Sequence, residues 1–121
     1  MEKYDLIIVG AGPAGIFTAV ELLRHGSKKK MLLVEKGKPV EKRHCPKAEV
    51  GHCVNCRPTC AITTGFSGAG AFSDGKLSLS CEVGGTLPEL IGEELAQETI
   101  DYTDKIYLEF GADKHVEGVS D

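Results

Sequence analysis

The feature that most constrains the fold of this chain is a glycine-rich turn at residues 10–15, GAGPAG, which separates two segments of different periodicity. The run from Leu6 to Val9 is short, branched and apolar throughout, which is typical of a parallel strand covered on both faces. From Ile16 to Leu23 the apolar residues recur every three or four positions, which is typical of an α-helix that packs along one face. The sequence therefore predicts a strand, a tight turn and a helix in direct succession.

Each position of this turn has a distinct physical role. Gly10 allows the tight turn, Gly12 lets the backbone approach a diphosphate, and Gly15 lets the helix pack closely on the strand. Pro13 falls in the first helical turn, where its missing N–H costs no hydrogen bond. Around it and Ala14, free N–H groups and the positive end of the helix dipole attract an anion. These five residues are the first predicted cofactor-binding residues.

A second apolar run, Met31 to Val34, predicts another strand, and Glu35 follows it twenty residues after Gly15. An acid at this position of a strand–helix–strand unit commonly accepts a hydrogen bond from a ribose hydroxyl, and it disfavours a 2′-phosphate. Glu35 and the adjacent Lys36 are therefore predicted cofactor-binding residues. We expect an α/β fold in which residues 1–36 form a Rossmann-like βαβ unit within a three-layer core.

The middle of the chain, residues 37–85, is irregular and rich in cysteine and glycine. Four of the five cysteines lie within sixteen residues, and they are Cys45, Cys53, Cys56 and Cys60. Thiolates this close together predict a zinc ion or an iron-sulfur cluster, although the spacing matches neither a zinc ribbon nor the common ferredoxin pattern. Alternatively, Cys53 and Cys56 cycle between dithiol and disulfide, with pKa values lowered by nearby basic residues, or the cysteines are inert. The basic residues are Arg43, Lys47 and Arg57.

A second glycine-rich stretch, residues 63–77, contains four glycines and can bring many backbone N–H groups close to a ligand. Its predicted cofactor-binding residues are Ser67, Gly68, Gly70, Ser73, Gly75 and Lys76. A loop or hairpin without a ligand is the alternative. Residues 76–80 alternate like a short strand, and residues 86–111 predict one helix, with Thr86 and Glu89 as a capping box and Gly111 as its stop.

Charge and length limit the classes of function. A net charge of −4 and a pI near 5.6 argue against a nucleic-acid partner, for which a concentrated basic face is expected. The sequence has neither a signal-peptide layout nor the roughly 20 uninterrupted apolar residues of a membrane span, so we expect a cytoplasmic protein without a membrane partner. At 121 residues the chain has the size of one domain, whereas a complete dinucleotide-dependent redox enzyme usually has two. We therefore expect an N-terminal fragment, residues 1–121 being part of an FAD/NAD(P)-binding domain.

Two parts of the sequence resemble a known family. Residues 4–15 together with residues 35–37 resemble the FAD-binding start of the two-dinucleotide-binding flavoproteins. Residues 51–56 through 65–77 resemble a narrower group, the FAD-dependent dehydrogenases known as NAD(FAD)-utilising. The resemblance implies FAD in the first site, Glu35 on the adenosine ribose, and residues 67–76 near the diphosphate and isoalloxazine.

The resemblance also sets the functional expectation. Members of the family complete the flavin site with a Gly-Asp motif near their C-terminus, and this motif is absent here. We expect the FAD-binding portion of a flavin-dependent oxidoreductase, with NAD(P)H as electron donor and a small-molecule substrate; no catalytic residue can be named. The alternatives are an NAD-binding Rossmann module without flavin and a small protein with a zinc or iron-sulfur cysteine cluster.

Overall fold

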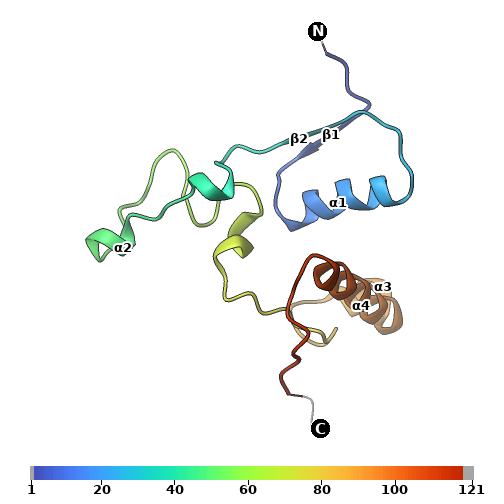
Figure 1. The fold of residues 1–121 in the computed structure, drawn as a ribbon. Helices are drawn as coiled ribbons and strands as arrows, with labels where there is room; N and C mark the ends of the chain where they lie inside the picture. Colours follow the sequence, from blue (N-terminus) through green and yellow to red (C-terminus); the bar gives the residue numbers. More distant parts are fainter. Residues whose placement is uncertain (1, 119–121) are drawn as a thin grey trace. The chain divides into compact units, whose positions relative to one another are not determined.

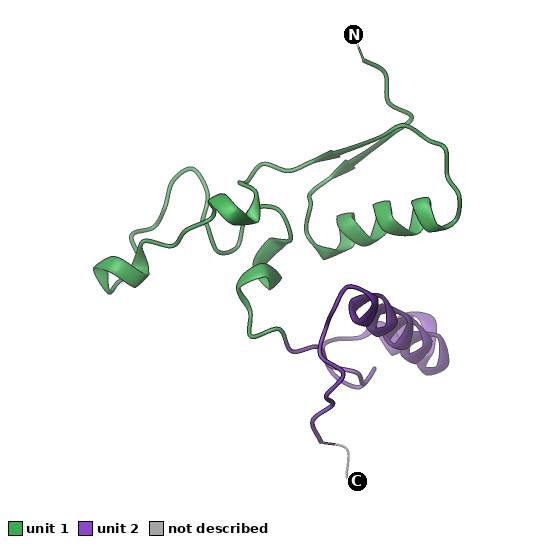
Figure 2. Ribbon diagram, in the orientation of Figure 1, with its two compact units in different colours: residues 1–75 green, residues 76–121 purple. Residues whose placement is uncertain are grey.

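The structure is a computed structural model that describes residues 2–118, and the chain divides into two compact units, residues 1–75 and residues 76–121 (Figure 2). In chain order, the first unit contains β1 (Leu6–Val9), α1 (Pro13–Arg24), β2 (Met31–Val34), the 3-10 helix η1 (Val40–Lys42), α2 (Lys47–Val50) and the 3-10 helix η2 (Gly68–Phe72). The second unit contains α3 (Leu87–Ile91) and α4 (Glu93–Glu109).

Strands β1 and β2 form a parallel pair, and α1 is the crossover between them (Figure 1). Their register runs from Leu6 opposite Met31 to Val9 opposite Val34. One step further, the N–H of Gly10 donates to the carbonyl oxygen of Val34 at 2.7 Å. Neighbouring parallel strands need such a crossover connection, because a hairpin turn reverses the chain direction and therefore joins antiparallel strands. The predicted strand–helix–strand order is confirmed.

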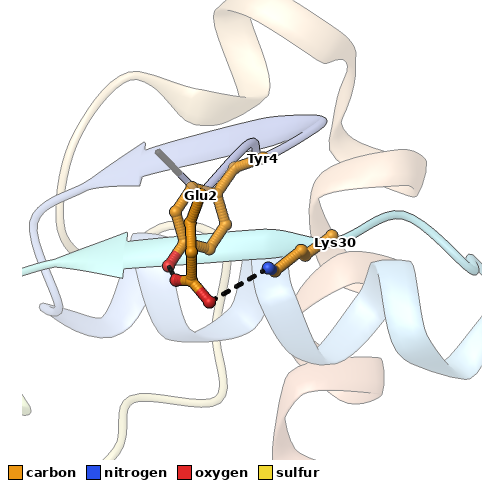
Figure 3. A network of polar contacts seen from close by, with 3 residues as sticks. All are labelled: Glu2, Tyr4 and Lys30. Atoms are coloured by element: carbon orange, nitrogen blue, oxygen red, sulfur yellow. Dashed lines mark hydrogen bonds and ion pairs between the residues drawn. The ribbon is translucent and has the colours of Figure 1, made fainter.

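The starts of the two strands are joined by a polar network (Figure 3). The hydroxyl of Tyr4 donates to the Glu2 carboxylate at 2.6 Å, and Lys30 forms an ion pair with the same carboxylate at 3.5 Å. The Lys30 ammonium also lies 4.9 Å from the centroid of the Tyr4 ring, and its backbone N–H donates to Asp5. The bond to Glu2 raises the pKa of Tyr4 because it stabilises the protonated phenol.

Helix α1 packs against one face of the β1–β2 pair, as the close approach of Gly15 to Ile8 shows. On the other face, Ile7 is 57% exposed and Val9 is 85% exposed. The predicted coverage of β1 on both faces is therefore wrong for this chain, and the three-layer core is not confirmed. Residues 37–75 form short helical turns rather than a second layer over these side chains.

In the second unit, the predicted helix over residues 86–111 is two helices, α3 and α4. The helix is interrupted at Gly92, whose φ of +85° and ψ of 151° lie outside the helical region. Ala96 and Ile106 are the buried residues of α4, and Gly111, with a φ of +95°, follows its end as predicted. Thr86 makes no side-chain capping bond, so the predicted capping box is wrong. Among the described residues, no helix has both the length and the apolar character that crossing a bilayer demands.

Residues 76–80 form no strand, contrary to the alternation in their sequence. The side chain of Gln97 on α4 binds the backbone of this region instead. Its amide nitrogen donates to the Leu79 carbonyl oxygen at 2.8 Å, and its oxygen accepts from the Cys81 N–H at 3.1 Å. A side chain thus satisfies the backbone groups that a partner strand would otherwise pair.

Candidate functional site

The glycine turn connects β1 to α1, and the protein itself requires two of its glycines, one for its backbone angle and one for packing. Gly10 has a φ of +100°, a conformation that other residues rarely adopt. A Cβ on Gly15 would lie 1.9 Å from the Gly10 carbonyl oxygen and 3.3 Å from Cγ2 of Ile8. Both roles predicted for these residues, the tight turn and the close helix–strand packing, agree with this geometry.

Gly12 differs from these two glycines because the protein itself does not need a glycine there. Its φ of −78° suits any residue, and a Cβ at this position would meet no atom within 4 Å. Pro13 occupies the first position of α1, and the first helical hydrogen bond runs from the Ile16 N–H to the Gly12 carbonyl oxygen at 3.0 Å. The N–H group of Ala14 precedes that bond and belongs to the free N-terminal end of the helix. The turn therefore offers open space beside donors that suit an anion.

Glu35 ties the end of β2 to this turn. One carboxylate oxygen accepts the Ala11 N–H at 2.9 Å, and the other accepts the Gly37 N–H at 2.8 Å. The Ala11 N–H first, and then the Gly37 N–H, holds the pKa of Glu35 below its ordinary value, with a smaller contribution from the positive charge of exposed Lys36. An ionised carboxylate has about four acceptor sites. Glu35 therefore keeps capacity for a ligand hydroxyl while it holds the turn.

Part of the second glycine-rich stretch lies against the first. The N–H of Ser67 donates to the Ala11 carbonyl oxygen at 2.7 Å. A Cβ on Gly68 would lie 3.4 Å from Cδ of Pro13 and 3.5 Å from the Cα of Gly12. Ser67 and Gly68 both have positive φ, +70° and +64°, at the start of η2. Two segments that are more than fifty residues apart thus meet at one place.

The remaining predicted residues of this stretch form a local turn. The Ser73 hydroxyl donates to the Gly70 carbonyl oxygen at 2.9 Å and accepts the Gly75 N–H at 3.2 Å. Lys76 is the first residue of the second unit. Ser67 and Gly68 thus lie at the glycine turn, whereas Gly70, Ser73 and Gly75 are bonded to one another.

A pair of glycines connects Glu35 to Ser67. A Cβ on Gly37 would lie 2.4 Å from the Cα of Gly65, so the two backbones cross in close contact. Beside this crossing, the Phe66 N–H donates to the Lys38 carbonyl oxygen at 3.1 Å. The residues after Glu35 therefore contact the residues before Ser67, and these contacts position Glu35 and Ser67 relative to each other.

Arg43 is a structural residue of the site that sequence reasoning missed. Its side chain is buried, with 6% of its surface exposed, and lies 4.7 Å from the ring centroid of Phe72 on η2. Its guanidinium donates to three backbone carbonyl oxygens at 2.5–2.8 Å, those of Ala61, Ile62 and Phe66. Arg43 thereby organises the segment that leads to Ser67 and Gly68. The sequence predicted only that this residue lowers thiol pKa values, because no short pattern marks an arginine that binds carbonyl oxygens.

The four clustered cysteines line one hollow of about 430 Å³. They are Cys45, Cys53, Cys56 and Cys60, the predicted metal ligands. Within residues 2–118, no three His, Cys, Asp or Glu side chains gather closely enough to hold a metal ion. A tetrahedral zinc site needs four sulfurs about 2.3 Å from one point, whereas these thiols lie around a much larger space. The structure gives no support to the predicted metal cluster.

One comparison with known protein families concerns the first unit. Residues 3–56 match the family described as FAD binding domain, a span that includes the first glycine turn and Glu35. This part of the chain is similar to FAD-binding domains. The family implies a Rossmann-like α/β fold, with which the parallel β1–β2 pair and its crossover helix agree. The match ends before the second glycine-rich stretch, which it therefore leaves unassigned.

Two curated relatives match parts of the chain. An uncharacterized protein of Clostridium beijerinckii is 40% identical over 72 residues, which are 60% of this chain and 13% of that protein. A Marinomonas mediterranea protein named "Putative FAD-dependent oxidoreductase LodB" is 51% identical over 37 residues, which are 31% of this chain and 10% of that protein. The chain thus corresponds to a small share of each relative's length. No solved structure matches it.

Proposed function

We propose that this chain is the FAD-binding N-terminal portion of a flavin-dependent oxidoreductase of the dehydrogenase type. The observation that carries the proposal is the open space at Gly12, where the protein's own packing does not need a glycine but the close approach of a diphosphate does. The match of residues 3–56 to FAD binding domains supports the choice of cofactor, and the name of the Marinomonas mediterranea relative supports the class of reaction.

The residues present fit the adenosine diphosphate half of FAD. The free N–H groups at the start of α1, including that of Ala14, would bind the diphosphate, and Glu35 would accept a ribose hydroxyl with its remaining lone pairs. Ser67 and Gly68 lie against the same turn and would limit the position of the diphosphate. When bound, the flavin supplies hydride or electron transfer, while the chain binds and orients it.

The finer parts of the proposal concern the residues and partners beyond this turn. We assign Lys36 to the adenosine side, and Gly70, Ser73, Gly75 and Lys76 to the diphosphate and isoalloxazine side, on the basis of the resemblance described above. NAD(P)H as electron donor, a small-molecule substrate and a cytoplasmic location complete the proposal.

The test is a titration of the 121-residue chain with FAD, followed by equilibrium dialysis and flavin absorbance. The proposal predicts one FAD per chain and weaker binding of NAD. Glu35→Gln should weaken FAD binding about tenfold, because a glutamine amide has only one accepting oxygen. Both oxygens of the carboxylate already accept backbone N–H groups, so the amide would have less capacity left for the ribose hydroxyl. Glu41→Gln is the matched control, since Glu41 is exposed on η1. This variant should bind FAD as tightly as the unaltered chain does.

Two results would contradict the proposal. Tighter binding of NAD than of FAD would favour a Rossmann module without flavin. Equal FAD affinity in Glu35→Gln and Glu41→Gln would remove Glu35 from the site.

A further inference from the structure

The part of the first unit around α2 gathers four thiols that the dinucleotide site does not use. Cys45, Cys53, Cys56 and Cys60 all line the 430 Å³ hollow, although fifteen positions separate the first from the last. The hollow is also lined by Lys47 and Arg57, and no carboxylate occurs among its described lining residues.

Cys60 has the surroundings of a reactive cysteine. It is exposed, and it begins a turn that the Thr64 N–H closes by donating to the Cys60 carbonyl oxygen at 3.0 Å. The backbone N–H group of Thr63, then that of Ile62, the Thr63 hydroxyl and the Arg43 charge lower the pKa of the Cys60 thiol. Cys53, by contrast, donates its thiol proton toward the Asn55 side chain at 3.8 Å. The two exposed cysteines of the hollow therefore differ in character, and Cys60 is the better nucleophile.

We propose that this hollow is a redox-active thiol site in which Cys60 attacks a small hydroperoxide and then forms a disulfide with another cysteine of the hollow. The geometry that carries the proposal is that exposed Cys60 lines one hollow with three further thiols and the basic residues Lys47 and Arg57. The hollow is wide enough for hydrogen peroxide, which is a small and uncharged molecule. The proposal does not depend on flavin binding.

The reaction balances in two steps. In the first, the Cys60 sulfur attacks one peroxide oxygen, the O–O bond breaks, and a sulfenic acid forms while hydroxide leaves and takes up a proton to give water. In the second, the thiol of the other cysteine attacks the Cys60 sulfur, the S–O bond breaks, the S–S bond forms, and a second water leaves. The two sulfurs together lose two electrons, which reduce one peroxide to two waters. A dithiol such as dithiothreitol reverses the change by thiol–disulfide exchange.

The experiment treats the reduced 121-residue chain with one equivalent of hydrogen peroxide. Free thiols are counted over time with a thiol reagent, and the disulfide is mapped by mass spectrometry of unreduced peptides. The proposal predicts that two of the five thiols disappear, that Cys60 is bridged to Cys45, Cys53 or Cys56, and that dithiothreitol restores both thiols. Cys60→Ser should lose thiols at least about tenfold more slowly because the best nucleophile is absent.

Cys81→Ser is the matched control, because Cys81 is a free cysteine of the second unit and does not line the hollow. It should be oxidised at the rate of the unaltered chain. The disulfide map of the unaltered chain keeps the test decisive even if Cys60→Ser folds poorly. Equal rates in Cys60→Ser and Cys81→Ser, or an oxidised chain in which Cys60 carries no disulfide, would overturn the proposal.

Discussion

Replacing Gly15 with alanine should open the contact between α1 and β1. The new Cβ would lie 1.9 Å from the Gly10 carbonyl oxygen, whereas a Cβ atom needs at least 3.0 Å, so the backbone must separate by about 1.1 Å. The atom that it meets is backbone and not the end of a flexible side chain. Overpacking of this kind costs about 3 kcal/mol.

Hydrogen exchange measured by mass spectrometry on peptides from β1 and α1 would detect this change without interference from the second unit. A cost of about 3 kcal/mol corresponds to exchange that is faster by about two orders of magnitude. Gly12→Ala is the matched control, because its Cβ meets no atom within 4 Å and its φ is ordinary. It should exchange as the unaltered chain does, or slightly more slowly, and yet lose FAD affinity.

The two substitutions therefore separate packing from ligand approach within one turn. The reasoning would be refuted by Gly15→Ala peptides that exchange at the unaltered rate. It would also be refuted by a Gly12→Ala chain that is folded and binds FAD with unchanged affinity.

Two further predictions concern the residues that hold the site. Arg43→Lys should destabilise residues 61–66 by about 2 kcal/mol or more, because the lysine ammonium cannot reproduce the three bonds of the guanidinium to carbonyl oxygens. Hydrogen exchange of that segment should become faster in Arg43→Lys and stay unchanged in the control Arg57→Lys, since Arg57 is exposed. Unchanged exchange in Arg43→Lys would contradict the role of Arg43. The pKa of Glu35 is lower in the folded chain than in the unfolded one, so its stabilisation of the turn is present above the unfolded value and is lost as the pH falls through the folded value. An NMR titration should show the Ala11 amide signal moving below pH 4.5, and a midpoint at or above 4.5 would contradict the assignment.

The sequence was sufficient to predict the βαβ unit because the constraints on it are local. Gly10 has a positive φ, and Gly15 leaves no room for a side chain. The two positions are only a few residues apart, and the order of strand, turn and helix predicts both requirements. Glu35 follows β2 as predicted, and its described partners are the backbone N–H groups of Ala11 and Gly37, while its ribose contact stays a prediction.

The parts that could not be predicted depend on contacts between distant residues or on single backbone angles. The crossing of Gly37 with Gly65 joins positions twenty-eight residues apart, and no periodic pattern records it. The buried role of Arg43 likewise depends on carbonyl oxygens supplied eighteen or more residues later. At Gly92, the apolar stripe continues through the break, so periodicity predicted one helix where a positive φ makes two.

The most direct test of the central claim is an NMR titration of the 15N-labelled chain with FAD. If the diphosphate binds at the start of α1, the amide signals of Gly12, Ala14 and Gly15 should shift first and furthest, together with those of Ser67 and Gly68. A chain whose glycine-turn signals do not move at saturating FAD, or whose shifts lie elsewhere, would contradict the account.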